Sequence, residues 1–220
     1  MKVVFTMGGI THYLSPLLDN VVRKGVDVVM VIPSVKDNQT IGKGVKLVNN
    51  EALYQVRYSE IKQGWYGKTI LTDLKTILNE EKPDIVVLGW PYFLQYFFDR
   101  QLRLLIKENN IKLIIREIPF QVPPFGQLSY FKENPVYDEN MILQSRGMSF
   151  FIRALCTMYI RKFVYKHADA TINYASCAYD ILPSYGVNKD KIFVTYNTPN
   201  TESLIRLREK VLSAPPLLEK

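Results

Sequence analysis

Short apolar runs alternate along the chain with segments whose apolar residues recur at helical spacing. The apolar runs predict strands over residues 3–6, 27–32, 45–48, 54–58, 85–89, 112–116, 170–174 and 192–196. The helical patterns cover residues 14–22, 69–79, 93–109, 148–167, 177–185 and 201–212. Ser15 followed by Pro16 is typical of an N-cap with proline at the first helical position, and Gly25 ends that helix.

Several of the predicted strands are continuously apolar, as at residues 85–88 and 113–115. Such strands suit burial on both faces, in a parallel sheet with helices on either side. We therefore predict an α/β fold with a doubly wound, Rossmann-like parallel sheet of about seven strands. Residues 117–147 contain four prolines and break the pattern, which indicates a long loop or a short insertion.

The composition is that of a globular protein, with 220 residues of which 47% are hydrophobic. Cys156 and Cys177 are the two cysteines, and His12 and His167 are the two histidines. Their spacing matches neither a disulfide framework nor a zinc cluster, so we expect no metal site. The amino terminus lacks the pattern of a secretory signal, and no stretch reaches the roughly 18 apolar residues of a membrane span. We expect a cytoplasmic protein.

The formal net charge of +7 is concentrated in one segment. Residues 140–168 contain no acidic side chain, but they contain Arg146, Arg153, Arg161, Lys162 and Lys166. This basic and aromatic segment predicts an anionic partner, and one hypothesis is peripheral attachment to the inner face of a membrane. On one unbroken helix, however, the arginines share one face and the lysines lie nearly opposite. The alternative is therefore a core helix with charges that reach solvent at their tips.

Gly8 and Gly9 directly follow the first strand, and His12 lies in the same loop. Doubly wound sheets bind ligands at the carboxyl ends of their strands, where glycine lets a phosphate or a sugar approach the main chain. The same glycines would equally form a tight turn, and His12 would equally bond the start of a helix. The dinucleotide pattern G-x-G-x-x-G is absent, which disfavours NAD.

Charged and aromatic residues follow two more of the predicted strands. Arg116 and Glu117 end the strand over residues 112–116, and Trp90 follows the strand that ends at Gly89. Each is a candidate substrate contact, although a local ion pair and packing of the indole above the sheet explain them equally well. Ser176 and Cys177 lack the surrounding pattern of a nucleophile, so no catalytic residue is identified.

Taken together, these landmarks resemble the amino-terminal half of a family 4 glycosyltransferase with the GT-B fold. The resemblance covers nearly the whole chain and rests on the order and spacing of Gly8-Gly9 with His12, the segments 82–87, 167–172 and 174–187, and the run 191–200. The last run, which includes Asn197, resembles the segment by which such enzymes leave their first domain.

The resemblance implies transfer of a sugar from a nucleotide-sugar to an acceptor, with retention of anomeric configuration and no cofactor. The nucleotide-sugar would be a co-substrate, and the acceptor a saccharide or a lipid-linked saccharide of cell-surface polysaccharide type. It implies that the first domain holds the acceptor and that Gly8 and Gly9 lie near phosphates. It also makes Asn197 a candidate substrate contact. Arg116 and Glu117 fall near the place where many members have a histidine, and this chain has none there.

The resemblance also predicts the domain organisation. Residues 1–200 would form the GT-B amino-terminal domain, and residues 201–220 a linker or helix toward a donor domain. The pair of glutamates eight positions apart that marks the donor half is absent. We therefore expect the donor half elsewhere, on a longer chain or on a partner chain, and we expect the 220 residues alone to transfer no sugar.

One alternative from a different class is a non-catalytic binding or partner subunit that completes a cleft with a second chain. A nucleotide-binding Rossmann enzyme is disfavoured by the missing fingerprint. Nucleic-acid binding is disfavoured because no recognised module occurs.

Overall fold

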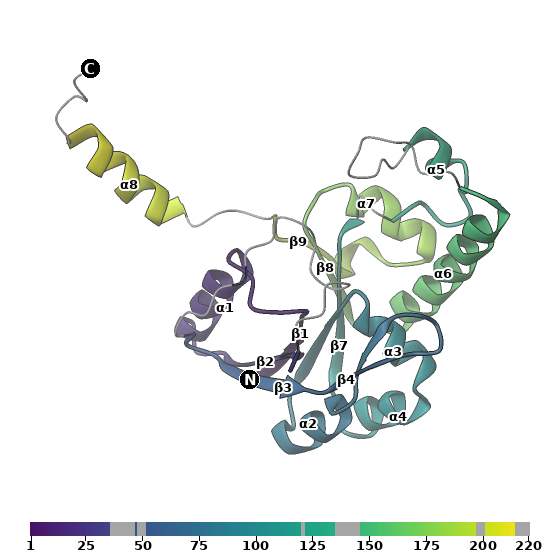
Figure 1. Cartoon of the computed structure of the whole chain (residues 1–220), viewed down its shortest axis with the longest axis horizontal. Coiled ribbons are helices and arrows are strands. Elements are labelled where there is room, and N and C mark those ends of the chain that lie inside the picture. The colour runs from purple at the N-terminus through teal and green to yellow at the C-terminus, as the bar shows by residue number, and fades with distance from the viewer. Residues whose placement is uncertain (36–46, 48–51, 120–121, 135–145, 197–200, 214–220) are drawn as a thin grey trace.

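Seven parallel strands form the centre of the molecule in the computed structural model, which describes residues 1–35, 47, 52–119, 122–134, 146–196 and 201–213 (Figure 1). The sheet order is β3-β2-β1-β6-β7-β8-β9. The strands are β1 (Lys2–Thr6), β2 (Asp27–Pro33), β3 (Gln55–Ser59), β6 (Ile85–Gly89), β7 (Lys112–Glu117), β8 (Ala170–Asn173) and β9 (Ile192–Val194). The predicted α/β fold class, with a Rossmann-like sheet of about seven strands, is confirmed.

Helices cover both faces of this sheet. Alternate residues of each strand point to opposite faces, and the apolar residues on each face pack against helices. Val4, Val29 and Val86 belong to the larger core, which packs against the helices between β3 and β9. Val28 and Met30 belong to a second core, against α1 (Leu14–Arg23). The helices of the larger core are α2 (Leu74–Glu81), α3 (Tyr92–Phe98), α4 (Arg100–Glu108), α6 (Met148–His167) and α7 (Ala178–Ile181).

The helix predicted over residues 69–79 is wrong in its first part. Residues Thr69–Leu71 form strand β5, which pairs antiparallel with β4 (Ile61–Gln63), and α2 begins only at Leu74. The buried side chain of Gln95 explains the difference. Its amide nitrogen donates to the Leu71 carbonyl at 2.9 Å, and its oxygen accepts from the Leu71 amide at 3.2 Å. The side chain thus takes the place of a neighbouring strand, which local helical spacing does not reveal.

Two predicted helix boundaries are also wrong. The helix predicted over residues 93–109 is broken at Asp99, whose carboxylate accepts hydrogen bonds from the Gln101 and Leu102 amides and caps α4. Helix α1 begins at Leu14, so Ser15 is not its N-cap. The Ser15 hydroxyl instead accepts a hydrogen bond from the Tyr54 hydroxyl at 2.9 Å, in the core beneath α1.

The remaining elements lie close to their predicted positions. Helix α6 has its predicted bounds, and residues 177–185 form α7 followed by the 3-10 helix η2 (Leu182–Tyr185), with η3 (Lys189–Lys191) beyond. A short helix, α5 (Tyr130–Glu133), interrupts the predicted loop. The strand predicted over residues 45–48 lies outside the described residues, except for Leu47, which forms an isolated bridge with Thr11.

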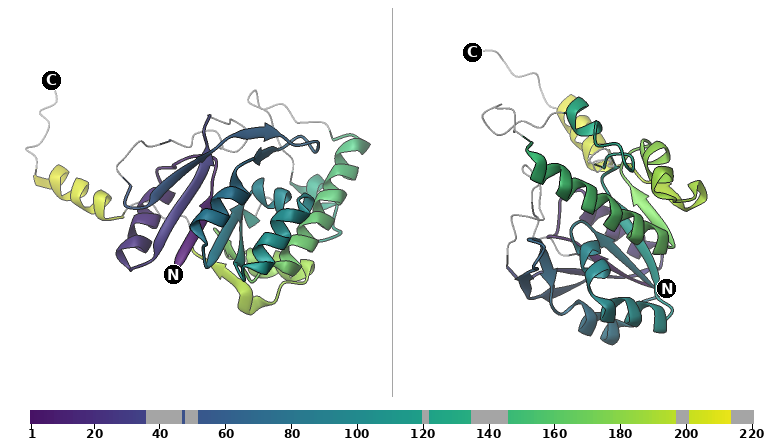
Figure 2. Two further views of the ribbon diagram at one scale, coloured as in Figure 1. Left: turned by 90° about the horizontal axis from the view of Figure 1, so that it is seen from below. Right: turned by 90° about the vertical axis from the view of Figure 1, so that its right-hand side faces the viewer.

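Helix α8 (Thr201–Ser213) extends away from the sheet and its covering helices (Figures 1 and 2). It carries five apolar side chains that are exposed to solvent, which are Leu204, Ile205, Leu207, Val211 and Leu212.

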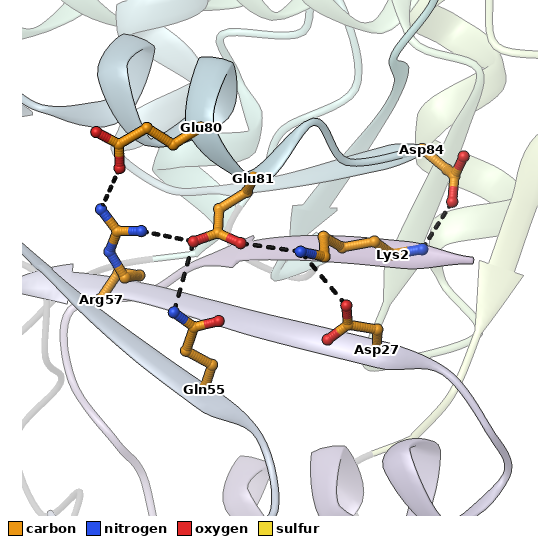
Figure 3. A network of polar contacts seen from close by, with 7 residues as sticks. All are labelled: Lys2, Asp27, Gln55, Arg57, Glu80, Glu81 and Asp84. Atoms are coloured by element: carbon orange, nitrogen blue, oxygen red, sulfur yellow. Dashed lines mark hydrogen bonds and ion pairs between the residues drawn. The ribbon is translucent and has the colours of Figure 1, made fainter.

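A network of charges closes the amino edge of the sheet (Figure 3). The Glu81 carboxylate at the end of α2 binds Lys2 of β1 at 3.0 Å and Arg57 of β3 at 2.5 Å. Burial opposes the charge of Glu81, but hydrogen bonds from these two cations outweigh it and lower its pKa. Asp27 of β2 lies 3.4 Å from the same Lys2 ammonium group. The network ties three strands and one helix together at the edge farthest from the carboxyl ends.

Candidate functional site

The order of the sheet reverses between β1 and β6, so the loops that follow these strands leave toward opposite faces. Ligands of open α/β sheets bind outside the carboxyl ends of the strands at such a switch point. Gly8 and Gly9 lie there, and both are buried. The Thr6 hydroxyl holds the two strand ends together, since it donates to the Val87 carbonyl at 3.2 Å and accepts from the Gly89 amide at 3.3 Å.

Strand β7 reaches the same edge with Arg116 and Glu117 as its last residues. The sequence left open a local ion pair as the role of these two charges, and in the structure Glu117 forms its ion pair with Arg161 rather than with Arg116. Because successive side chains of a strand alternate, Arg116 lies on the α1 face of the sheet and Glu117 on the α6 face. The two charges therefore have different surroundings and different roles.

The Arg116 guanidinium is surrounded by uncharged groups. It donates to the Met7 sulfur at 3.4 Å and to the Tyr174 hydroxyl, and it lies 4.5 Å from the centroid of the Tyr174 ring. Burial lowers its pKa to about 10, against an opposing effect of the Tyr13 phenol. None of the ion pairs formed by the described residues includes Arg116. The guanidinium is thus a cation without a protein counter-charge in the described part of the chain.

Glu117, in contrast, is the centre of a buried polar cluster. Its carboxylate lies 3.2 Å from the Arg161 guanidinium and accepts a hydrogen bond from the Tyr165 hydroxyl at 2.9 Å. The Glu117 and Arg161 side chains are only 4% and 11% exposed. Burial opposes the charge of Arg161, but the Glu117 carboxylate outweighs it and raises the Arg161 pKa. The pKa of the Tyr165 phenol is raised, mainly by burial and then by the nearby Glu117 carboxylate. This cluster joins β7 to α6.

Trp90 lies at the rim of the same edge and is 36% exposed. The Arg161 guanidinium lies 5.0 Å from its ring centroid, and the Phe93 ring packs edge-on against it at 5.4 Å. The indole is thus half covered from within and half open to solvent. His12 is exposed and its ring packs edge-on against Tyr13 at 5.4 Å. Asn197 lies outside the described residues.

The structure divides the five cations of the basic segment. Arg161 is buried against Glu117 and does not belong to a membrane-facing surface. Arg146 is half-buried, since it donates to the carbonyls of Phe131 and Asn134 and lies 5.1 Å from the Phe150 ring centroid. Arg153, Lys162 and Lys166 are exposed on α6. Only these three are free to meet a partner surface.

Two buried polar atoms at the carboxyl edge have no hydrogen-bond partner among the described residues. They are the Thr11 hydroxyl, in the loop after β1, and the side-chain oxygen of Asn173, the last residue of β8. Buried polar atoms are normally paired, so each exception needs an explanation. The one other such atom in the described residues, the Tyr66 hydroxyl, lies away from this edge on the loop between β4 and β5. Of the two atoms at the carboxyl edge, the Thr11 hydroxyl lies in the loop after β1, beside the switch point, whereas Asn173 ends β8, two strands beyond β6.

A cavity of about 470 Å³ lies elsewhere, between α4 and α6 at the opposite end of β7. Two of its charged side chains already have structural partners. Arg103 donates to the carbonyls of Tyr96 and Phe97, and Asp169 accepts from the Leu113 amide and pairs with Lys112. The carboxyl edge, with its uncompensated cation and unpaired polar atoms, is the better candidate site.

Sequence reasoning missed the aromatic residues that complete this edge. Tyr174 directly follows β8 and packs on Arg116, and Tyr165 anchors Glu117 from the middle of α6. The position of Tyr174 at the end of the strand predicted over residues 170–174 was a usable signal. Tyr165 gave none, because a tyrosine on an aromatic-rich helix is indistinguishable from its neighbours.

Among residues that the structure describes, no group of three or more His, Cys, Asp or Glu side chains is placed to hold a metal ion. No described helix has the length and apolar character needed to cross a membrane.

No protein-family model matches the chain, and no curated protein matches it. Among solved structures, the chain is similar to a UDP-GlcNAc 2-epimerase from Neisseria meningitidis bound to UDP-GlcNAc. The identity is 12% and the TM-score 0.51, over 97% of this chain and 50% of that one. It is also similar to a UDP-N-acetylglucosamine 2-epimerase from Rickettsia bellii, with 16% identity and a TM-score of 0.49, over 97% and 49% of the two chains.

The chain thus spans about half the length of the solved structures it matches. At these identities the likeness shows the fold alone. It supports the predicted architecture, one half of a GT-B-like fold. The family 4 resemblance is not shown by any of these matches.

Proposed function

We propose that this chain is the acceptor-binding half of a two-domain glycosyltransferase that uses a nucleotide-sugar. The observation that carries the proposal is the match of nearly the whole chain to half of a nucleotide-sugar enzyme with a GT-B-like fold. The proposal is supported by the position of the candidate site outside the carboxyl ends of β1, β6 and β7, where open α/β sheets bind their ligands.

The carboxyl edge has the side chains that a saccharide ligand needs. Trp90 presents a partly exposed ring on which a sugar face can stack, and its orientation is fixed from within by Arg161. The Thr11 hydroxyl supplies an unpaired hydrogen-bonding group in the loop after β1, and the side-chain oxygen of Asn173 supplies another at the end of β8. Gly8 and Gly9 lie in the loop after β1 and have no side chains to cover its main chain.

In the proposed reaction, the bond between the anomeric carbon of the donor and its diphosphate breaks, and a bond to an acceptor hydroxyl oxygen forms. The hydroxyl proton is lost and a nucleoside diphosphate leaves. We propose that the configuration at the anomeric carbon is retained and that no metal or other cofactor is required, as the family resemblance implies.

We further propose that residues 1–200 form the acceptor domain and that α8 leads toward the donor half. The five exposed apolar side chains of α8 support a helix that contacts another body. The donor half would lie on a longer chain or on a partner chain. If no donor half exists, the chain is a binding module, which is the alternative from a different class.

The experiment is to combine the chain with the half that completes it, identified from the coding DNA beyond codon 220. Mixtures of UDP-, GDP- and dTDP-sugars with lipid-linked saccharides are then analysed by mass spectrometry, with each half alone as the control. A new glycoside with release of nucleoside diphosphate, formed only when both halves are present, is the expected result. The absence of transfer with every donor contradicts the proposal.

The solved-structure match favours one second candidate, a nucleotide-sugar 2-epimerase. The same experiment distinguishes the two functions. An epimerase changes the configuration at C2 of UDP-GlcNAc in the absence of any acceptor, whereas a glycosyltransferase consumes donor only when an acceptor is present.

We also propose that α6 rests on an anionic membrane surface. Met148, Ile152, Leu155 and Tyr159 are exposed at spacings of four, three and four residues, which places them in one row along the helix. Lys162 and Lys166 continue the same row. The row therefore passes from apolar to basic, and an anionic lipid surface has complementary chemistry for both parts.

Co-sedimentation with phosphatidylcholine vesicles, with and without phosphatidylglycerol, tests this surface. The double variant Lys162→Glu/Lys166→Glu should lose binding to the anionic vesicles, and binding by the unchanged chain should weaken with salt. Lys24→Glu/Arg153→Glu, which reverses two exposed cations outside the row, is the charge-matched control and should bind as before. Equal sedimentation of the Lys162→Glu/Lys166→Glu variant and the unchanged chain contradicts the proposal.

A further inference from the structure

The surroundings of Arg116 differ from those of the other deeply placed arginine, Arg161. Arg161 lies 3.2 Å from a carboxylate, so its charge is neutralised within the fold. Arg116 contacts a thioether, a phenol ring and a phenol hydroxyl, and these groups are all uncharged. A guanidinium that has lost part of its hydration without gaining a counter-charge costs the folded state free energy.

A ligand that supplies a negative charge would explain this arrangement. Arg116 is the second-to-last residue of β7. Its side chain points to the α1 face, where the Gly8-Gly9 loop begins. Its contact with the Met7 sulfur places the guanidinium directly beside that loop. Tyr174, which follows β8, holds the guanidinium from the other side. Three strand ends thus fix one cation at the edge of the sheet.

The carboxylate of Glu117, the next residue in the sequence, does not neutralise Arg116. Glu117 lies on the opposite face of the sheet, where its partners are Arg161 and Tyr165. Among the described residues, the side chains beside Arg116 are the Met7 thioether and the phenols of Tyr13 and Tyr174, and none of them is a carboxylate.

We propose that Arg116 binds an oxyanion of the ligand, a carboxylate or a phosphate, so that the substrate class of this site is an acidic saccharide or a phosphorylated one. The inference rests on the proposed function only for the ligand being a saccharide. The planar guanidinium suits both groups, because its paired N–H donors match two oxygens of a carboxylate or phosphate. A neutral saccharide bound alone would leave the charge uncompensated.

Isothermal titration of the 220-residue chain with glucuronate, glucose 1-phosphate and glucose tests the proposal and separates the two sources of negative charge. At least one of the two anions should bind more tightly than glucose, and the preferred anion identifies the group. Arg116→Met should weaken that binding roughly tenfold or more, as expected for loss of a hydrogen bond between charged groups. Arg116→Lys keeps the charge and should lose less. The control is Arg100→Met, which removes an exposed arginine on α4 and should leave binding unchanged.

A purely structural role for Arg116 makes a different prediction about stability. If Arg116 serves only to pack against Tyr174, Arg116→Met lowers the thermal midpoint of the ligand-free chain. If its charge awaits a ligand, the midpoint of the ligand-free variant is equal to or above that of the unchanged chain. The preferred anion then raises the midpoint of the unchanged chain but not that of the variant.

Equal binding of glucose and both anions overturns the proposal. So does unchanged anion binding by Arg116→Met, or the absence of anion binding by the unchanged chain. These results are distinguishable from failure of the proposed function. Anion binding that depends on Arg116, without sugar transfer by the completed enzyme, supports the inference and contradicts the glycosyltransferase. Sugar transfer that is insensitive to Arg116→Met supports the glycosyltransferase and contradicts the role of Arg116.

Discussion

Replacement of Glu117 by glutamine is the sharpest test of the buried cluster between β7 and α6. The substitution keeps the shape of the side chain and an oxygen that accepts from Tyr165, but it removes the charge that neutralises Arg161. At the observed separation of 3.2 Å, an effective dielectric constant of about 20 gives an attraction of about 5 kcal/mol. Both side chains are nearly inaccessible, so solvent screens little of this attraction.

Loss of one partner of a buried pair costs about 3–5 kcal/mol, because the other charge stays buried without compensation. We expect Glu117→Gln to lie near the lower limit, about 3 kcal/mol less stable, because the amide retains hydrogen bonding. Urea denaturation followed by circular dichroism measures the free energy of unfolding. Glu108→Gln, an exposed substitution of the same type on α4, should change it by less than about 0.5 kcal/mol.

A double-mutant cycle identifies the cause of the loss. In Glu117→Gln/Arg161→Met no buried charge is left without a partner. The double variant should therefore be more stable than the sum of the two single losses predicts, by about 2 kcal/mol or more. Additive losses, or a Glu117→Gln variant as stable as the unchanged chain, would refute the interpretation that the pair is charged and coupled.

Three further substitutions test other parts of the fold. Because the pKa of Glu81 lies below its ordinary value of 4.5, its ion pairs stabilise the fold above that pH and are lost as the pH falls through the lowered pKa. Urea titrations from about pH 6 to pH 3 should therefore show a smaller loss of stability for Glu81→Gln than for the unchanged chain. Gln95→Ala leaves both main-chain groups of Leu71 buried without partners, and it should cost about 2–4 kcal/mol in the same assay, against less than about 0.5 kcal/mol for exposed Gln101→Ala. Asp99→Ala removes the N-cap of α4 and should lower the thermal midpoint, at a cost of about 1 kcal/mol, whereas Asp99→Asn should retain most of the capping.

The fold was predictable where local pattern and tertiary structure agree. The run 85–88 is apolar without interruption because β6 lies in the middle of the sheet and is covered on both faces. The prediction for residues 69–71 was wrong because their pairing partners, β4 and Gln95, are not neighbours in the sequence. The prediction of an unbroken helix through Asp99 was wrong because the local sequence is ambiguous. An aspartate between two apolar stretches suits a helix cap as well as a solvent-facing turn of a longer helix.

The candidate site was predictable in its location but not in its chemistry. That Gly8, Trp90 and Arg116 share one edge follows from parallel strands, whose carboxyl ends lie together. That Arg161 turns inward to Glu117 does not follow from composition, since an acid-free segment looks like a surface patch whether or not one cation is paired across the fold. Charge in a sequence gives the number of ions but not their partners.

The alternation along β7 has a consequence for how this edge acquires its electrostatic sign. The consecutive residues Arg116 and Glu117 are a cation that faces the proposed ligand side and an anion that faces the interior. A single-residue slip of β7 in the sheet would exchange them, and the ligand side would become acidic while a guanidinium entered the core beneath α6. The sign of the potential at the carboxyl edge is therefore set by strand register rather than by composition. Two chains with the same residues here, paired one position apart, would select ligands of opposite charge.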